Sequence, residues 1–166
     1  MKMDALFQKG IRLLKKLDFY ALKADESIFK NCYSLIHPAL LFFIWGELTN
    51  SKKKYQAAVE ILKDLLEEML NSHEYDTAGE ICISLLKSLN KASSELRVMR
   101  HYHDKGKKIF QSLRDLHPDE PFYVESLIEL KSIWQEHSGE EKNLDALCVL
   151  ASKLYLKSAE GIQRES

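Results

Sequence analysis

Apolar side chains recur at helical spacing along most of the chain, and this periodicity constrains the fold more than any other feature. In the clearest stretch, Tyr55, Ala58, Leu62, Leu65 and Met69 fall on one face of a helix. The 166 residues include only 6 glycines and 3 prolines, which are too few for the many turns of a β-sandwich or barrel. No segment alternates as a strand would. We therefore predict an all-α fold.

The apolar stripes divide into about seven helices with short connections, so consecutive helices are expected to be antiparallel. The helices are expected over Asp4–Leu22, from Asp25 or Ser27 to Leu48, from Ser51, from Thr77, from Ser93 or Ser94, over Phe122–His137, and from Asn143. The start residues of the second, third, fifth and seventh helices are predicted N-caps. The fourth start has capping-box spacing, because Glu80 follows Thr77 by three residues.

Prolines and polar segments set the expected boundaries. Pro38 cannot donate to the preceding helical turn, so it is expected to break or kink the second helix. Pro118 and Pro121 are expected to end the fifth helix. No flexible linker divides the sequence, and residues 1–166 are predicted to form a single helical domain with a possible articulation near residues 50–54.

A short pattern recurs where several helices are expected to start. A residue with a ring side chain is followed by a small residue three positions later. Two bulky apolar residues then follow, six and seven positions after the ring residue. Its copies begin at Tyr55, Tyr75 and His103, with Ala58, Ala78 and Gly106 as the small residues, and a fainter copy begins at Asn143. A small residue in this position lets a neighbouring helix approach closely.

The stretches Tyr55-x-x-Ala58-Val59 and Tyr75-Asp76-x-Ala78 resemble the second helix of a tetratricopeptide repeat. The resemblance covers roughly residues 54–118, although the copies begin at irregular intervals of 20, 28 and 40 residues. It implies a curved stack of helical hairpins that binds a peptide or a partner protein. The residue pattern leaves two architectures open, an irregular helical bundle and a short tetratricopeptide-like superhelix.

Charge and cysteine content exclude several classes of protein. The net charge is −1, so no global field draws the chain to nucleic acid or to anionic lipid. The longest apolar run, over residues 38–45, is much shorter than the roughly 20 residues of a membrane span. Cys32, Cys82 and Cys148 are widely spaced among apolar residues and are predicted to be buried free thiols. These features favour an intracellular protein, cytoplasmic or nuclear, that has no contact with a membrane.

The sequence offers no candidate catalytic residue, metal site or cofactor. His101 and His103 would diverge by about 200° on a helix and could not share one metal ion. Asp115, His117 and the carboxylates at residues 119 and 120 crowd one loop. They are interpreted as a solvated turn whose carboxylates stabilise the next helix rather than as a cation site. We therefore expect a protein without enzymatic activity.

Three aromatic residues are the leading candidates for contact with a partner. Phe42, Phe43 and Trp45 lie in a helix that is apolar on every side, so protein must surround this helix. Two interpretations remain open, a central core helix and a helix that projects aromatic side chains into an interface with a partner protein or a second copy.

Two charged segments are further candidate surfaces. Residues 60–80 carry seven acidic residues against one lysine, and residues 97–114 carry six basic residues against one aspartate. Candidate contacts in these segments are Glu67, Glu68, Arg97, Arg100, Lys107 and Lys108. The predicted function is a protein-interaction module, an adaptor or a subunit of a larger assembly, which binds a partner helix or peptide in a groove between helix pairs. The alternative is a nucleic-acid-associated protein that uses the basic face.

Overall fold

The computed structural model describes residues 4–10, 12, 33–139 and 144–164, and these residues form helices joined by short turns, with no strand among them. A helical segment over residues 4–10 precedes six longer helices. The longer helices are α2 (Tyr33–Thr49), α3 (Lys52–Asn71), α4 (Tyr75–Ala92), α5 (Leu96–Leu116), α6 (Pro121–Ser138) and α7 (Asp145–Arg164). The predicted all-α fold is confirmed. The predicted helix starts at Asp25 or Ser27 and at Asn143 lie outside the described residues.

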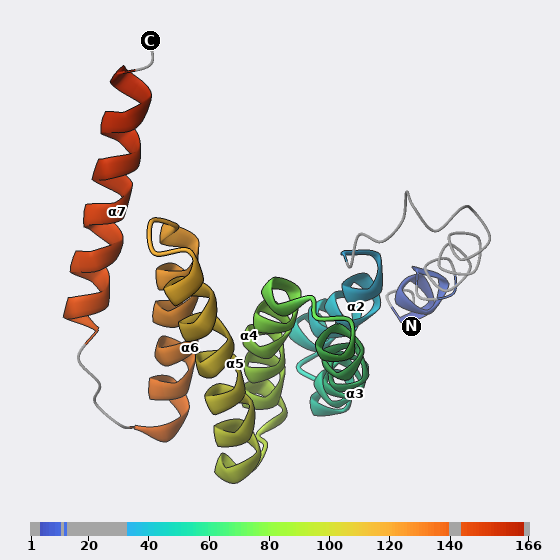
Figure 1. Cartoon of the computed structure of the whole chain (residues 1–166). Helices are drawn as coiled ribbons and strands as arrows, with labels where there is room; N and C mark the ends of the chain where they lie inside the picture. The colour runs from blue at the N-terminus through green and yellow to red at the C-terminus, as the bar shows by residue number, and fades with distance from the viewer. Residues whose placement is uncertain (1–3, 11, 13–32, 140–143, 165–166) are drawn as a thin grey trace.

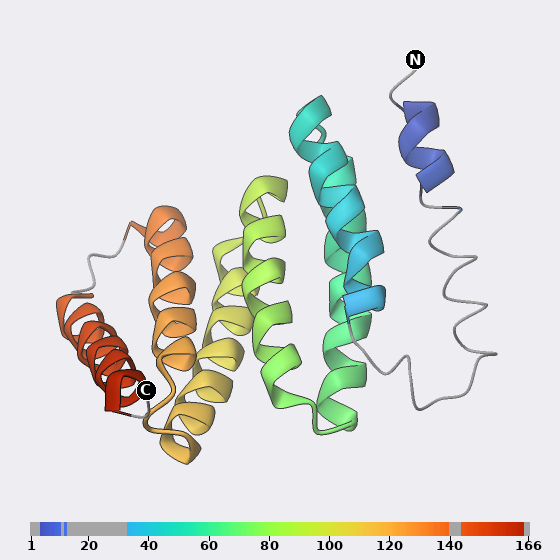
Figure 2. The same cartoon turned by 90° about the horizontal axis from the view of Figure 1, so that it is seen from above.

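The helices are arranged in a row that follows the order of the chain (Figure 1). Each helix from α2 to α7 packs against the next one, and α4 also contacts α6. The turns alternate between the two long sides of the row, so consecutive helices run antiparallel (Figure 2). This arrangement follows from the short connections, which allow a helix to reach its immediate neighbours.

One continuous hydrophobic core runs through α3, α4, α5 and α6. Its largest fully buried side chains include Phe110 and Trp134, and Ala78 and Leu85 are also completely buried. The apolar stripes seen in the sequence supply these residues. α7 adds a smaller cluster, in which Ala151 and Leu154 pack against Val124 of α6.

Glycines permit the closest helix crossings in this core. A Cβ atom at Gly106 would lie 2.8 Å from Cys82 Cβ and 3.1 Å from Leu130 Cδ1, and one at Gly79 would lie 2.7 Å from the Phe110 ring. Gly106 therefore lets α5 approach both α4 and α6, as the recurring pattern predicts for its small residue.

The predicted start of α4 at Thr77 is wrong. The helix begins at Tyr75, and the Ala78 N–H already donates to Glu74 O at 2.9 Å. Thr77 therefore lies inside the first turn and cannot act as its N-cap. The preceding turn is tight, with His73 in the left-handed region at φ 60°, and it starts the helix two residues earlier than the capping pattern indicates.

The predicted N-cap of α5 at Ser93 or Ser94 is also wrong, because these residues end α4. Ser93 has φ 58°, its N–H donates to Asn90 O, and the Ser94 N–H donates to Leu89 O. This pair of bonds is the Schellman arrangement that terminates helices. Glu95 then precedes α5. Ser51 does precede α3, but its side chain makes no capping hydrogen bond.

The prolines act differently from the prediction at two positions. Pro38 lies inside α2, which runs through it without a break. A proline inside a helix removes one backbone hydrogen bond, and the packing of α2 on α3 supports the helix despite this loss. Pro121 is the first residue of α6 rather than the end of α5, a position where its missing N–H costs little.

Candidate functional site

An apolar groove lies between α2 and α4. Its volume is about 200 Å³. The lining residues are Ala39, Leu40 and Phe43 from α2, Leu62 from α3, and Ser84, Lys87 and Ser88 from α4. We call this feature the α2/α4 groove. It exists because α2 and α4 both pack against α3 and are held apart by it, with Leu62 as the floor.

The wall formed by α2 continues beyond the groove as an apolar stripe. Leu40, Ile44 and Leu48 repeat every fourth residue, and their side chains are 49%, 41% and 58% exposed. Phe43 is half-buried and meets the ring of Tyr55 edge to face at 5.5 Å between centroids. Leucine and isoleucine side chains this exposed on one helix face, next to a groove, are typical of a contact surface.

The wall formed by α4 contributes small and charged side chains. The Ser88 hydroxyl donates to Ser84 O at 2.9 Å, so this hydroxyl is satisfied within its own helix. Serines at these two positions leave space that larger residues would fill. Lys87 Nζ lies at the rim, 2.6 Å from Glu129 Oε1 of α6. The groove is therefore apolar inside and carries charge at its edge.

A three-residue network links the helices that form the groove. Tyr55 Oη donates to Glu47 Oε1 at 2.5 Å, and Lys91 Nζ lies 3.3 Å from the same oxygen. The hydrogen bond from Tyr55, together with Lys91, lowers the pKa of Glu47. Burial, followed by the neighbouring carboxylate, raises the pKa of Tyr55 to about 12. The network therefore joins α2, α3 and α4 through side chains that do not line the groove.

The three aromatic candidates on α2 fall on two different faces. Phe43 lines the α2/α4 groove. Phe42 and Trp45 face the other way, with their rings stacked at 5.8 Å, and Trp45 is only 1% exposed. Residues 4–10 cover Trp45 through the ring of Phe7. Trp45 therefore lies in the core, whereas Phe43 remains accessible at the surface.

The charged candidates lie on the surfaces of α3 and α5. Glu67, Glu68, Arg97 and Lys108 are exposed. The other two candidates of the basic segment are less open to solvent or lie beside α6. Lys107 is partly buried, and the guanidinium of Arg100 lies 5.6 Å from the centre of the Trp134 ring in α6. Asp104 is exposed among these cations. The basic surface is thus interrupted, and it turns partly towards α6.

The histidine and carboxylate candidates do not form a metal site. His103 is 3% exposed and stacks on Trp134 at 5.0 Å, whereas His101 is exposed. Glu120 accepts from the Phe122 N–H at 3.5 Å at the start of α6, which is the stabilising role predicted for this loop. Within the described residues, no group of three or more His, Cys, Asp or Glu side chains could hold a metal ion.

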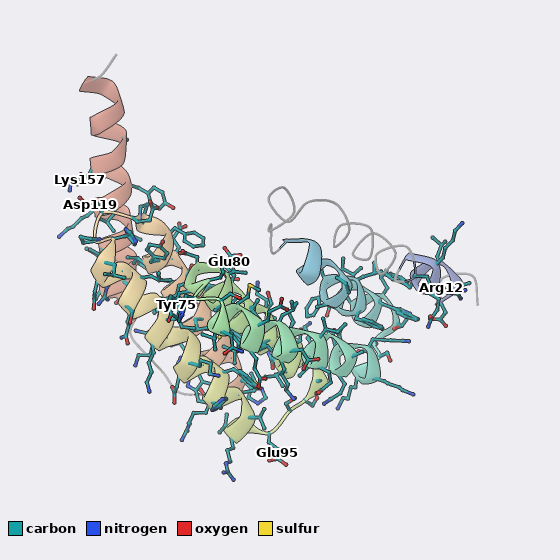
Figure 3. All side chains as sticks on the ribbon, turned by 45° about the vertical axis from the view of Figure 1, so that its right-hand side comes forward. Arg12, Tyr75, Glu80, Glu95, Asp119 and Lys157 are labelled. Atoms are coloured by element: carbon teal, nitrogen blue, oxygen red, sulfur yellow. The ribbon has the colours of Figure 1, made fainter. Side chains whose placement is uncertain are left out.

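At the opposite end of the row, a surface ion pair joins α7 to the loop that precedes α6. Lys157 Nζ lies 2.7 Å from Asp119 Oδ1, and both side chains are largely exposed (Figure 3). The carboxylate of Asp119 is thus engaged by a lysine of this chain. The contact therefore links the interior of α7 to the loop before α6.

The cysteines differ from one another in burial. Cys82 is fully buried as predicted, and burial raises the pKa of its thiol to about 12. Cys148 is exposed on α7, so its predicted burial is wrong. α7 has α6 as its main neighbour, which leaves the Cys148 side of the helix uncovered. Cys32 lies outside the described residues.

Several groove residues were not selected from the sequence, although signals for some of them were present. The spacing of Leu40, Ile44 and Leu48 marks one helix face, and Ser84 with Ser88 marks a shallow strip on an otherwise apolar helix. The juxtaposition of the two strips depends on the packing of both helices on α3, which no local pattern specifies.

Comparisons with known proteins give no relative for this chain. No protein-family model, no curated protein and no solved structure matches it. Among the described helices, none combines the length and the apolar character needed to cross a bilayer.

Proposed function

We propose that this protein is a non-catalytic interaction module, an adaptor or a subunit of a larger assembly, and that it binds an amphipathic helix of a partner protein in the α2/α4 groove. The observation that carries the proposal is the open apolar groove beside the exposed Leu40 and Ile44 side chains. Helix-in-groove recognition uses apolar anchors about one turn apart. The exposed stripe on α2 offers matching positions at the same spacing.

Charge at the rim suggests the chemistry of the partner. Lys87 is about half exposed, and its surface pair with Glu129 contributes little net stability. A partner carboxylate can therefore exchange with Glu129 at small cost. The proposed partner helix carries apolar residues on one face and an acidic residue at the edge of that face.

The arrangement of the helices supports a tetratricopeptide-like interpretation of this module. Each helix packs on its neighbours in the chain, and α4 contacts the next-but-one helix, α6. This pattern is typical of stacked hairpins, in which each unit contacts the adjacent units. Such stacks commonly present extended binding surfaces, which agrees with the proposed role.

A charge inserted into the groove tests the proposal. Leu40→Glu places a carboxylate at the groove wall, and Leu156→Glu is the matched control, because Leu156 is 64% exposed on α7, away from the groove. Tagged wild type and both variants would be used to capture partners from a native lysate, with quantitative mass spectrometry as the readout. Proteins captured by the wild type and by Leu156→Glu should be lost from Leu40→Glu.

One result of this capture experiment would contradict the proposal. If Leu40→Glu retains its helical circular dichroism spectrum and captures the same proteins in the same amounts as the control, the groove is not the binding site. A steeply salt-dependent affinity for a labelled oligonucleotide that is lost in Arg100→Glu/Lys107→Glu would instead favour the nucleic-acid alternative.

A further inference from the structure

The wall that α4 contributes to the α2/α4 groove separates its charges by sign. Helical spacing places four residues along one side of α4, which are Glu80, Ser84, Lys87 and Lys91. Ser84 and Lys87 line the groove. Glu80 lies about one turn before Ser84, and Lys91 lies about one turn after Lys87. The wall is therefore acidic towards the start of α4 and basic towards its end.

The acidic end of this wall carries negative charge that no described cation balances. Burial, followed by the charges of Asp76 and Glu129, raises the pKa of Glu80, and no cation among the described side chains opposes that shift. Glu129 of α6 is itself paired with Lys87 at 2.6 Å. A partner carboxylate that replaces Glu129 on Lys87 would leave Glu129 beside Glu80 without its cation. An acid bound at Lys87 therefore increases the need for a base at Glu80.

The two helices that flank the groove point in the same direction. Glu47 near the end of α2 lies 3.3 Å from Lys91 near the end of α4, measured from Oε1 to Nζ. The C-terminal ends of both helices, which carry partial negative charge, therefore meet at the basic end of the groove. A helix bound in the groove is favoured when its N-terminus, which carries partial positive charge, lies at that end. This orientation is antiparallel to α2 and α4, as that of α3 is on the other side.

We propose that the partner helix binds antiparallel to α2 and α4, and that the edge of its apolar face carries an acidic residue followed two turns later by a basic residue. The acid contacts Lys87, and the base contacts Glu80 and Glu129. Lys87 and Glu80 are two turns apart on α4, so the partner charges are about seven residues apart. Acids near the start of a helix and bases near its end also suit the partner's own dipole. This charge order is an addition to the proposed function of the groove and rests on it.

The test is a selection from a phage-displayed library of helical peptides of about 18 residues, which is long enough for helix formation. Each peptide has an apolar face of varied sequence, and Glu, Lys or Gln is allowed at two edge positions two turns apart. The immobilised full-length chain selects binders, and sequencing counts each charge order. Peptides with the acid first and the base second should be enriched about tenfold or more over peptides with the reverse order. Their enrichment should be lost on Leu40→Glu.

Variants of α4 identify which groove residue reads the second charge. Glu80→Lys should reverse the preference at the second position from a basic to an acidic residue, and Glu80→Gln should abolish it. The preference for an acid at the first position should stay, because Lys87 is unchanged. Glu67→Lys is the matched control, since Glu67 is exposed on α3 and lies about 140° around that helix from the groove residue Leu62. The control should select the same charge order as the wild type.

Two results would overturn the orientation and charge order while leaving the groove as the binding site. The first is a wild-type pool that is lost on Leu40→Glu but shows no charge order or the reverse one. The second is an unchanged preference for a base at the second position on both Glu80→Lys and Glu80→Gln. A pool that is enriched equally on Leu40→Glu, or no enrichment on the wild type, would instead contradict the proposed function itself and the charge order with it.

Discussion

The hydrogen bond between Tyr55 and Glu47 gives the sharpest quantitative prediction. Tyr55→Phe deletes the hydroxyl that donates to Glu47 Oε1 but keeps the ring, which is 4% exposed and packs beside Phe43 and Gly46. Hydrogen bonds to charged groups contribute about 1.5–3 kcal/mol. The Glu47 side chain is 42% exposed, so water competes for it, and the expected loss is about 1 kcal/mol.

Urea unfolding followed by circular dichroism measures this loss. With a denaturant dependence of about 2 kcal/mol per molar urea for a chain of this size, the midpoint should fall by about 0.5 M. Glu47→Gln and the double variant complete a thermodynamic cycle. The two substitutions should be non-additive, because each removes the same charge-assisted bond.

The difference in stability between the wild type and Tyr55→Phe should depend on pH, in the direction set by the two pKa shifts. The pKa of Glu47 is lowered from 4.5 in the folded protein, so its stabilising contribution is complete above that value and is lost as the pH falls through the folded pKa. The pKa of Tyr55 is raised from 10.0 to about 12, so its contribution is complete below pH 10 and is lost as the pH rises towards 12. An unchanged midpoint for Tyr55→Phe at pH 7, or a difference that persists undiminished well below pH 4, would refute this account of the network.

Three further predictions concern burial. Phe110→Ala should lower the free energy of unfolding by about 3–5 kcal/mol, because the completely buried ring leaves a cavity; a loss below about 1 kcal/mol in urea unfolding would contradict the packing described. In native protein, iodoacetamide should alkylate the exposed Cys148 well before the buried Cys82, whose thiol pKa is about 12. Peptide mass spectrometry measures the order, and earlier alkylation of Cys82 would contradict the prediction. Lys157→Ala should change stability by less than about 0.5 kcal/mol, because its pair with Asp119 is exposed, as thermal unfolding can check.

The sequence was sufficient for the described helices and insufficient for the starts of two of them. Apolar stripes define helices directly, because burial of one face requires that spacing. The starts of α4 and α5 depend instead on left-handed residues at His73 and Ser93. A capping pattern such as Thr77 with Glu80 competes with these turns, and the backbone geometry of the preceding connection decides the outcome.

The candidate site was predictable only in part. Phe43 was selected because a helix that is apolar on every side must contact protein or a partner on every side, and it does line the groove. Trp45 satisfied the same reasoning but is buried beneath residues 4–10. The hydrophobic pattern alone cannot distinguish an aromatic side chain that is covered by a distant segment of the chain from one that stays accessible.

The neighbour-by-neighbour packing of the row also determines how the protein loses structure. α7 has α6 as its principal support, whereas α4 is held by α3, α5 and α6. In a linear array, disruption at one terminus need not propagate, because the cost of separating each unit is set by its own interfaces. The molecule should therefore peel from the α7 end while the α3–α6 centre stays intact, and native-state amide hydrogen exchange would show protection rising from that end towards α4.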